Sequence, residues 1–359
     1  MKLKIAALIV FLTVFNLLFA KEKEEKESWE YYDAEKVKIS RTHRLTVDGN
    51  YRWPRWSSDG KKISADNYYG LQIFEFKENG KEIEKIGEIP EYTDYTWSPD
   101  GNSIVYSLNE DGTGLSLWLL KIGKEKEKLK IISNERLITN GGTNLSWSPD
   151  GKKIVFSGDK SLVLLDSDGT NRRVLIEGEK VWEPKFISND EILYLKGPIE
   201  VEFEPGIYAF EEMRHLFKLN IIANKETSLL PEKIIGEFNV VTIEKKKGKL
   251  YCVVERGEEV FIINLDMTQK VELPGKTGVQ DFSPDGSKIV DVKIEIERDI
   301  AVASEIYVMN TNGKGMKQLT NTSNIIEDDV RWSPDGKWLL YINVTESSIY
   351  VSKLTRHND

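Results

Sequence analysis

Short apolar runs separated by turn-forming residues follow one another along almost the whole chain. In the clearest units an aromatic residue precedes Ser-Pro-Asp-Gly, and an apolar run such as residues 153–157 comes directly after it. A second run, such as residues 306–309, leads into a Gly-containing hairpin at residues 310–313 and a last run at residues 317–320. Pro presets φ for the first central position of the turn, and Gly accepts the positive φ at its exit. The pattern predicts four short strands per unit, joined by tight turns.

This unit recurs at a nearly constant spacing. Its opening aromatic residue and turn are found at Trp56, Trp97, Trp147, Phe282 and Trp332. Weaker copies begin at Phe186 and near Thr242, so that successive units start 39–56 residues apart. Four strands in a period of about 40–50 residues are typical of β-propeller blades. We expect an all-β propeller of seven four-stranded blades, with the motif aromatics wedged between neighbours; six blades remain the alternative if one weak copy only elaborates its neighbour.

The two ends of the repeat region complement each other. The last unit supplies only three strands, the third at residues 348–352, while residues 44–47 resemble the fourth strand of the preceding unit. We therefore expect the N-terminal strand to complete the last blade and close the ring. On this interpretation residues 40–359 form a single propeller domain. Residues 197–214 are inserted into the fourth unit and residues 293–304 into the sixth, where either a binding element or an extended hairpin would fit.

The N-terminus has the pattern of an export signal. Lys2 and Lys4 precede an apolar run at residues 5–20, and a dense run of Lys and Glu follows it. We interpret residues 1–20 as a secretory signal peptide, or alternatively as an uncleaved anchor, and residues 21–39 as a charged linker. The protein is then exported, to the periplasm or the cell exterior. Cys252 is the single cysteine, so no internal disulfide is expected.

The Trp-Ser-Pro-Asp-Gly turns, together with residues 306–313 and the trailing Gln318-Leu319-Thr320, resemble the WD40-like (PD40) propeller repeats of the TolB family. The resemblance spans roughly residues 40 to 355 and also extends to the propellers of prolyl-oligopeptidase-type peptidases. It implies a propeller fold and, through TolB, a place in a cell-envelope complex. TolB also has an N-terminal α/β domain, which the short charged stretch before the first strand does not provide.

Charge and motif content exclude several functions. The net charge is −9, and no stretch concentrates Lys and Arg without interleaved Glu, so a nucleic-acid partner is not expected. No Gly-x-Ser-x-Gly nucleophile elbow is present. The histidines His43, His215 and His357 are dispersed, unlike the histidine-rich metal site of polyuronate lyases with a similar propeller. The sequence predicts a protein that is not an enzyme and needs neither metal nor cofactor.

The candidate binding surface is the face around the central channel, formed by the segments that enter each innermost strand. These segments carry aromatic and acidic residues suited to protein or sugar recognition. The candidates are Tyr51, Arg52, Trp53, Tyr92, Asp94, Tyr95, Asn144, Trp182, Glu183, Gln280, Asp281, Glu327, Asp328 and Asp329. The leading hypothesis is a non-catalytic scaffold of the cell envelope that binds a protein or peptide. A carbohydrate-binding or polyuronate-lyase-like propeller is the alternative, and a purely structural envelope component is a third.

Overall fold

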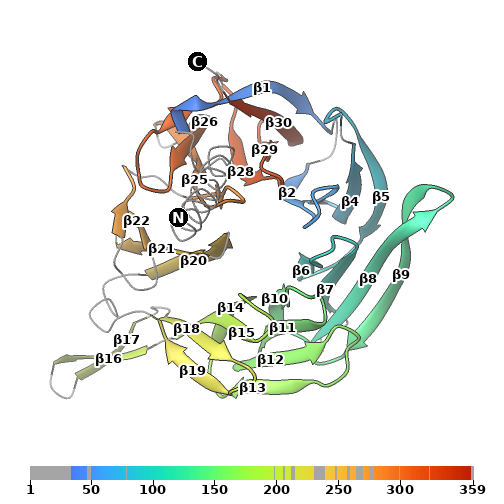
Figure 1. Ribbon diagram of the computed structural model, residues 1–359, viewed down its shortest axis with the longest axis vertical. Helices are drawn as coiled ribbons and strands as arrows, with labels where there is room; N and C mark the ends of the chain where they lie inside the picture. Colours follow the sequence, from blue (N-terminus) through green and yellow to red (C-terminus); the bar gives the residue numbers. More distant parts are fainter. Residues whose placement is uncertain are drawn as a thin grey trace, which may run out of the picture.

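The computed structural model shows a ring of seven four-stranded antiparallel sheets arranged as blades around a central channel (Figure 1). It describes residues 34–46, 50–77, 79–110, 112, 114–197, 199–204, 207–211, 215–229, 239–246, 249–256, 259–263, 270–274, 279–298, 300–322 and 324–356. Within these residues the only helical element is a single 3-10 turn, η2 (Ala34–Lys36). The expected all-β propeller with seven blades is confirmed. Among the described residues no helix has the length and apolar character needed to cross a bilayer.

Each blade is built from consecutive strands that run from the channel outward. The first three blades consist of β2 (Arg52–Trp56), β3 (Lys62–Asn67), β4 (Gly70–Phe76) and β5 (Ile83–Ile89); β6 (Asp94–Trp97), β7 (Ser103–Asn109), β8 (Leu115–Glu125) and β9 (Lys128–Ile138); and β10 (Thr143–Trp147), β11 (Lys153–Gly158), β12 (Ser161–Asp166) and β13 (Arg173–Glu177). Blades 4 and 5 consist of β14 (Val181–Phe186), β15 (Glu191–Lys196), β18 (His215–Asn220) and β19 (Lys225–Ser228); and β20 (Asn239–Lys246), β21 (Lys249–Arg256), β22 (Glu259–Ile263) and β23 (Lys270–Glu272). Blade 6 consists of β24 (Asp281–Phe282), β25 (Lys288–Glu297), β26 (Ile300–Asn310) and β27 (Lys317–Gln318).

Blade 7 joins the two ends of the chain. It contains β28 (Glu327–Trp332), β29 (Trp338–Asn343), β30 (Ser348–Arg356) and, as its outermost strand, β1 (Val37–Arg44). Figure 1 shows β1 lying along β30 at the top of the ring. The expected closure by an N-terminal strand is therefore confirmed, although the strand lies mainly upstream of the predicted residues 44–47.

The closing strand is longer than the sequence indicated. β1 pairs with β30 from Val37 opposite Arg356 to Arg44 opposite Tyr350, and the Leu45 N–H continues the ladder to the Ile349 carbonyl at 2.8 Å. Ala34–Lys36 form η2 and β1 starts at Val37, although we expected residues up to 39 to be linker. The predictions for residues 1–20 and the first part of the linker concern residues outside those described.

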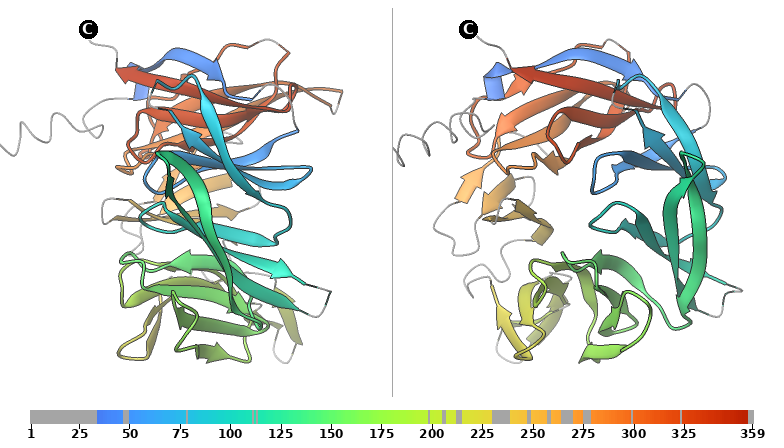
Figure 2. Two further views of the ribbon diagram at one scale, coloured as in Figure 1. Left: turned by 90° about the vertical axis from the view of Figure 1, so that its right-hand side faces the viewer. Right: turned by 45° about the vertical axis from the view of Figure 1, so that its right-hand side comes forward.

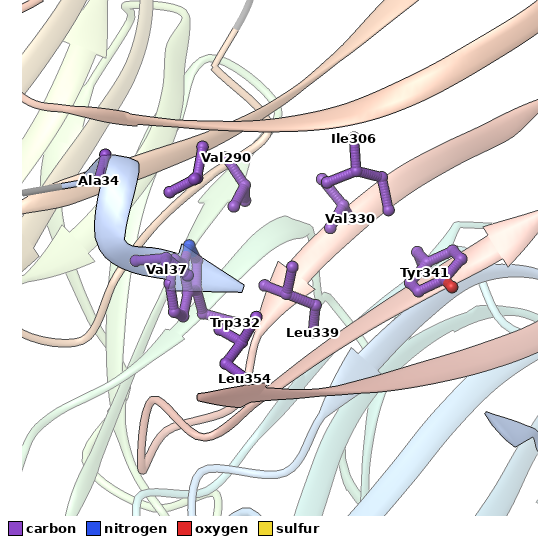
Figure 3. Close-up of a cluster of buried hydrophobic side chains, with 10 residues drawn as sticks. Ala34, Val37, Val290, Ile306, Val330, Trp332, Leu339, Tyr341 and Leu354 are labelled. Carbon is purple, nitrogen blue, oxygen red and sulfur yellow. The ribbon is translucent and has the colours of Figure 1, made fainter. Parts of the chain in front are cut away.

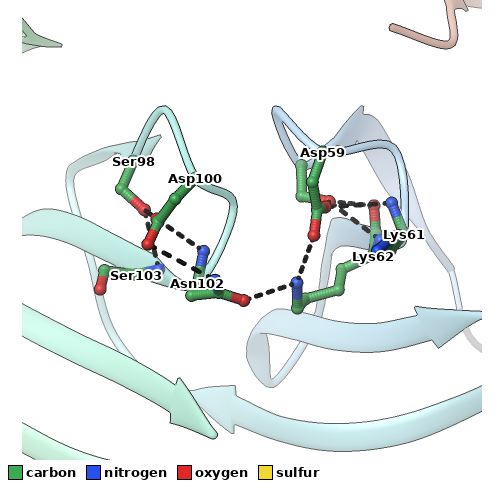
Figure 4. Close-up of polar contacts among 8 residues, drawn as sticks. Asp59, Lys61, Lys62, Ser98, Asp100, Asn102 and Ser103 are labelled. Atoms are coloured by element: carbon green, nitrogen blue, oxygen red, sulfur yellow. Dashed lines mark hydrogen bonds and ion pairs between the residues drawn. The ribbon is translucent and has the colours of Figure 1, made fainter. Parts of the chain in front are cut away.

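The repeated turn is held by one hydrogen-bond pattern. In the second blade the Ser98 hydroxyl donates to Asp100 at 2.6 Å and accepts the Ser103 N–H at 2.9 Å, while Asp100 also accepts the Asn102 N–H at 3.0 Å (Figure 4). The glycine that ends the turn adopts a positive φ in all five copies, for example 69° at Gly101. Ser and Asp are therefore required by the turn itself, since their side chains satisfy the backbone groups that the reversal leaves unpaired.

The core lies in the spaces between blades. Between blades 6 and 7 a cluster combines residues from both ends of the chain, including Ala34, Val37, Val290, Ile306 and Leu354 (Figure 3). The motif aromatics occupy these spaces as expected. The Trp97 indole, 7% exposed, donates its N–H to Ser64 of the preceding blade at 2.9 Å. Burial of these faces is the main favourable term for a fold that has no helix layer.

Two blades have extended hairpins between their second and third strands. In blade 4 the insertion forms a separate ribbon, β16 (Ile199–Glu204) paired with β17 (Ile207–Glu211), which projects from the ring in Figure 1. In blade 6 the extension simply lengthens β25 and β26, whose pairing continues to Glu297 opposite Ile300.

The ring seen from the side in Figure 2 is one blade thick. We define its entry face as the end at which the innermost strands of the blades begin; every hairpin between second and third strands lies at the same end.

Candidate functional site

The innermost strands share a bulge at the entry face. Trp53, Asn144, Glu183 and Asp329, each three residues before a motif aromatic, have φ of 49°, 55°, 48° and 51°. At each of them the register of the innermost strand shifts against its neighbour. Asn and Asp tolerate this left-handed conformation, but for a residue as bulky as Trp it is an outlier that costs about 1–2 kcal/mol. Strain of this kind is typical of positions that place a side chain for binding.

A cleft of about 680 Å³ opens at the entry face where blades 1, 6 and 7 meet. Its lining residues come from the start of β2, the segment before β24, the start of β28 and the β29–β30 hairpin. They are Asn50, Tyr51, Arg52, Trp53, Arg55, Gln280, Asp328, Asp329, Arg331, Ile342, Val344 and Ser347. Six of the fourteen predicted residues are thus brought together here. The closing hydrogen bond from the Tyr51 N–H to the Ser347 carbonyl, 3.2 Å, joins the two walls.

Two arginines neutralise the carboxylate at the base of the cleft. Asp329, 8% exposed, accepts a hydrogen bond from Arg55 Nη1 at 2.6 Å through Oδ2. Its Oδ1 accepts from Nε and Nη2 of Arg331 at 3.0 and 2.6 Å. Arg331 Nη1 also donates to the carbonyl of Gln280, which ties blade 7 to blade 6. These charge-assisted bonds fix the floor of the cleft and occupy most of the lone pairs of Asp329.

Arg52 and Trp53 are two exposed side chains of the cleft. Trp53 is 55% exposed, and the exposed Arg52 makes no hydrogen bond or ion pair with any residue that the structure describes, although its charge acts on Asp66. The register pairs Arg52 with Asp66, next to the hairpin tip where Tyr68 and Tyr69 are 88% and 71% exposed. One end of blade 1 therefore presents a guanidinium and three aromatic rings to solvent.

The predicted set did not include Arg55, Arg331, Tyr68 and Tyr69. Arg55 and Arg331 occupy the same repeat position, directly before the motif aromatics Trp56 and Trp332. Because side chains alternate along a strand, that position faces away from the inter-blade core, and this signal could have found them. Tyr68 and Tyr69 lie in a hairpin whose place beside the cleft depends on the register of β2 and β3, which the sequence does not show.

Several candidates from blade 2 have structural roles. Tyr92 and Tyr95 pack edge to face, with ring centroids 5.4 Å apart, against the core between blades 1 and 2. Tyr95 Oη lies 3.0 Å from Ser64 Oγ. Asp94 Oδ2 accepts the N–H of Leu145 in the next blade at 3.2 Å; burial raises its pKa, and the backbone N–H groups that it accepts oppose the rise. Asp94 thus braces one blade against the next.

The remaining candidates lie outside the cleft as well. Asp281 accepts the Trp332 N–H at 2.8 Å, which repeats the brace made by Asp94. Trp182 packs against the core between blades 4 and 5, and Asn144 and Glu183 are half-buried in blades 3 and 4. Glu327 is only 3% exposed, so our expectation that it is presented at the channel face is wrong. Its side chain turns from the channel toward blade 6, where it bonds to Thr320.

No group of three or more His, Cys, Asp or Glu side chains within the described residues is arranged to hold a metal ion. His43 lies in β1 and His215 in β18, in different blades, while His357 is outside the described residues. Burial lowers the pKa of His215.

Comparison with known proteins adds the fold relationship. No protein-family model and no curated protein sequence matches the chain. An oligogalacturonate lyase from Vibrio parahaemolyticus is similar in structure, with a TM-score of 0.59 and 14% identity over 89% of this chain and 91% of that one. An oligogalacturonate lyase in complex with manganese gives 0.57 and 12% over the same shares. TolB from Acinetobacter baumannii gives 0.46 and 13% over 76% of this chain and 63% of its own. At such low identities the two oligogalacturonate lyase structures show a shared propeller fold alone.

Proposed function

We propose that this protein is an exported, non-catalytic propeller that binds a protein or peptide segment in the cleft between blades 1, 6 and 7. The observation that carries the proposal is Trp53, an exposed indole held in a strained left-handed conformation beside the exposed Arg52 guanidinium, which makes no hydrogen bond to any residue that the structure describes. An exposed Trp in this conformation costs free energy, and strained residues of this kind cluster at sites that bind a partner or ligand.

The residue types favour a protein partner. Trp, Tyr and Arg dominate the binding energy of protein interfaces, because each combines a large contact area with a polar group. Here Trp53, Tyr68, Tyr69 and Arg52 lie at one end of a single blade. The exposed Val344, 45% accessible, extends the apolar surface onto blade 7. A partner segment with apolar side chains for the rings and a carboxylate for Arg52 would satisfy these groups together.

The cleft is poorly suited to general acid–base chemistry. Its buried carboxylate, Asp329, is engaged by Arg55 and Arg331, which leaves it as a structural anion. A catalytic base needs a free lone pair within hydrogen-bond reach of the proton it removes.

The apolar N-terminal run with its flanking lysines supports export, and the proposed location is the cell envelope.

Affinity capture from an envelope extract tests the proposal. Wild-type protein and the variant Arg52→Ala/Trp53→Ala are immobilised in parallel, with Ile222→Ala as control because Ile222 is 75% exposed on the opposite face. The expected result is a protein retained by wild type and control and lost by the double variant, with the affinity then measured on the purified partner. Equal retention by all three would reject the cleft as the binding site.

Carbohydrate binding is a second candidate, favoured by the three exposed rings of Trp53, Tyr68 and Tyr69. Aromatic faces at a polar rim also suit sugar rings. A glycan array probed with wild type and with Trp53→Ala separates the two candidates. Glycan binding that disappears in Trp53→Ala, together with no captured protein, would replace the protein-binding proposal.

A further inference from the structure

Glu327 lies in the seam between blades 6 and 7 and joins them through both its backbone and its side chain. Its N–H donates to Ser304 Oγ at 2.6 Å, and the Ser304 hydroxyl donates to its carbonyl oxygen at 2.6 Å. The Thr320 hydroxyl donates to Glu327 Oε2 at 2.6 Å while accepting the Ile306 N–H at 2.8 Å. Ser304 N–H also bonds to the Ile325 carbonyl at 2.9 Å. The start of β28 is therefore held on β26 by one short network.

The surroundings of the Glu327 carboxyl are unfavourable for a negative charge. The side chain is 3% exposed, and its nearest ionisable neighbour on blade 6 is a second acid, Glu305. Glu305 Oε1 accepts the Thr322 N–H at 2.6 Å, while its Oε2 is buried with no hydrogen-bond partner. From blade 7 the group that faces Glu327 is the phenol of Tyr341.

No cation compensates either acid within the part of the chain that the structure describes. Lys293 lies opposite Glu305 in the β25–β26 ladder, but its ammonium sits over the Tyr307 ring, 5.3 Å from the centroid. Burial, reinforced by the charge of Glu305 and opposed by the Thr320 hydroxyl, raises the pKa of Glu327 to about 7. A buried carboxylate without a cation is costly, so the neutral acid is the form that the seam accommodates.

The seam is also a wall of the cleft. Glu327 is followed directly by Asp328 and Asp329, which line the cleft, and Gln280 of blade 6 faces them. Val344 N–H bonds to the Ile326 carbonyl at 2.7 Å, so the segment before Glu327 also positions the β29–β30 hairpin at the rim. Any loosening of residues 325–327 from β26 would reach three parts of the cleft.

We propose that Glu327 is a proton-operated catch: while its carboxyl is neutral it keeps the first residues of blade 7 docked on blade 6, and ionisation loosens them and the adjoining wall of the cleft. No bond is made or broken other than the O–H bond of the carboxyl, whose proton passes to solvent water. The role of the catch in ligand binding rests on the proposed function of the cleft, but the catch itself does not.

The sign of the effect on stability follows from linkage. The folded protein holds the Glu327 proton up to about pH 7, whereas the unfolded chain releases it near the ordinary value of 4.5. Between these values the native state binds more protons than the unfolded state, so stability falls as pH rises from about 4.5 and levels off above about 7. Over that window the contribution of this group to the folding equilibrium constant falls on the order of 100-fold.

The decisive variant is Glu327→Gln, which keeps the shape and cannot ionise. Urea unfolding of wild type at pH 5, 6, 7 and 8 is expected to show a falling midpoint that flattens in the variant, with the variant more stable than wild type at pH 8. Glu295→Gln, at an exposed acid of the adjoining blade 6, is the matched control and should keep the wild-type pH profile. Identical profiles for wild type and Glu327→Gln would overturn the proposal.

Two measurements keep the proposal testable if Glu327→Gln folds poorly, and neither uses a ligand. In protein labelled at the Glu side-chain carboxyl carbon, NMR should show one carboxyl titrating near pH 7, and Glu305→Gln should move that midpoint down; no such titration overturns the catch. Amide-exchange protection of residues 327–331, corrected for intrinsic rates, should be lower at pH 8 than at pH 6 in wild type. Unchanged protection would show that the cleft wall does not respond. Because failure to capture a partner leaves these readouts untouched, it would count against the proposed function alone.

Discussion

At the scale of single residues, repeat position and environment assign different tasks to chemically similar side chains. Asp94 and Asp281 each accept a backbone N–H of the next blade, Asp329 is held by two arginines, and Glu327 is buried between blades. All four are acids at the start of an innermost strand. What separates them is the partner that the neighbouring blade supplies, since a buried carboxylate adopts whichever protonation state its hydrogen bonds and charges favour.

Trp53 offers a direct test of stored backbone strain. Trp53→Asn should leave the protein at least as stable as wild type, with a gain of up to about 1 kcal/mol, because Asn tolerates the left-handed conformation and the lost indole is mostly exposed. Chemical denaturation measures the change. Tyr69→Asn serves as control, because Tyr69 is more exposed than Trp53 and is not among the residues with positive φ, and it should give no gain. A clear loss of stability in Trp53→Asn would show that the indole packs more than its exposure indicates.

At the scale of elements, the recurring turn is the unit that fixes each blade. The turn connects the innermost strand to the second strand. In every strong copy the Ser hydroxyl donates to the Asp carboxylate and the Gly has a positive φ. In the first copy Lys62 extends the pattern across blades, since its ammonium bonds to Asp59 at 2.9 Å and to Asn102 of the next turn at 3.2 Å (Figure 4). The turns of the first two blades are therefore joined to each other.

Two turn glycines separate backbone strain from crowding. A Cβ at Gly101 would meet the carboxyl carbon of Asp59 at 2.6 Å, whereas at Gly151 the nearest atom is 3.9 Å away, and φ is about the same, 69° and 70°. Gly151→Ala should cost about 1–2 kcal/mol of stability from the positive φ alone. Gly101→Ala should cost measurably more, because it also displaces Asp59 from its hydrogen bonds. Thermal or urea unfolding of the pair checks the order, and equal losses would show that Asp59 moves aside freely.

The aspartates of the repeated turns make the stability of the fold depend on pH in the acid range. Burial opposes ionisation in all five and is the largest single influence in four, but the Ser hydroxyl, a backbone N–H and a nearby Lys hold the pKa of each below its usual value. A lowered pKa contributes stability above the unfolded value near 3.8 that is lost as pH falls through the folded value. We expect the unfolding midpoint to drop below about pH 4, and Asp335→Asn to reduce that slope. A midpoint independent of pH between 4 and 2 would contradict this account.

At the scale of the whole molecule, ring closure depends on the pairing of the two ends of the chain. The Thr42 and Ser352 hydroxyls lie 2.8 Å apart across β1 and β30, separated by 310 residues in sequence. Contacts of such separation carry a large loop-closure entropy, so a propeller held by one terminal strand depends strongly on it. The core cluster that includes Ala34 and Val37 supplies the compensating burial.

A disulfide across this closure tests it. Thr42→Cys/Ser352→Cys should form a bond under oxidising conditions and raise the unfolding free energy by about 2–5 kcal/mol relative to the reduced form. The native Cys252 should not interfere, because it is fully buried and burial raises the pKa of its thiol to about 12. Ser40→Cys/Ser352→Cys, which the register does not pair, is the control. Failure of the paired cysteines to oxidise would indicate that β1 does not dock as described.

The fold could be predicted from the sequence to the level of blade number and ring closure, and the site only in part. Six predicted residues meet in the cleft, because the entry segments of blades 1, 6 and 7 are marked by their distance from the repeat aromatics. Other predicted residues were expected at the surface but take part in packing: Trp182 packs against a core cluster, and Glu327 is buried. The repeat position shared by Arg55 and Arg331 places them off the inter-blade core, but their common partner, Asp329, became evident only from the tertiary structure.

The sequence by itself determined the architecture, because each blade is specified locally by an aromatic, a tight turn and alternating apolar runs whose period admits few other arrangements. The tertiary structure alone decided which acids are braces, which is clamped and which is buried, since those properties depend on groups from other blades, as far as 274 residues away for Arg55 and Asp329. It also decided the left-handed bulge at Trp53, which arises from the pairing of two strands and leaves no trace in the order of residues.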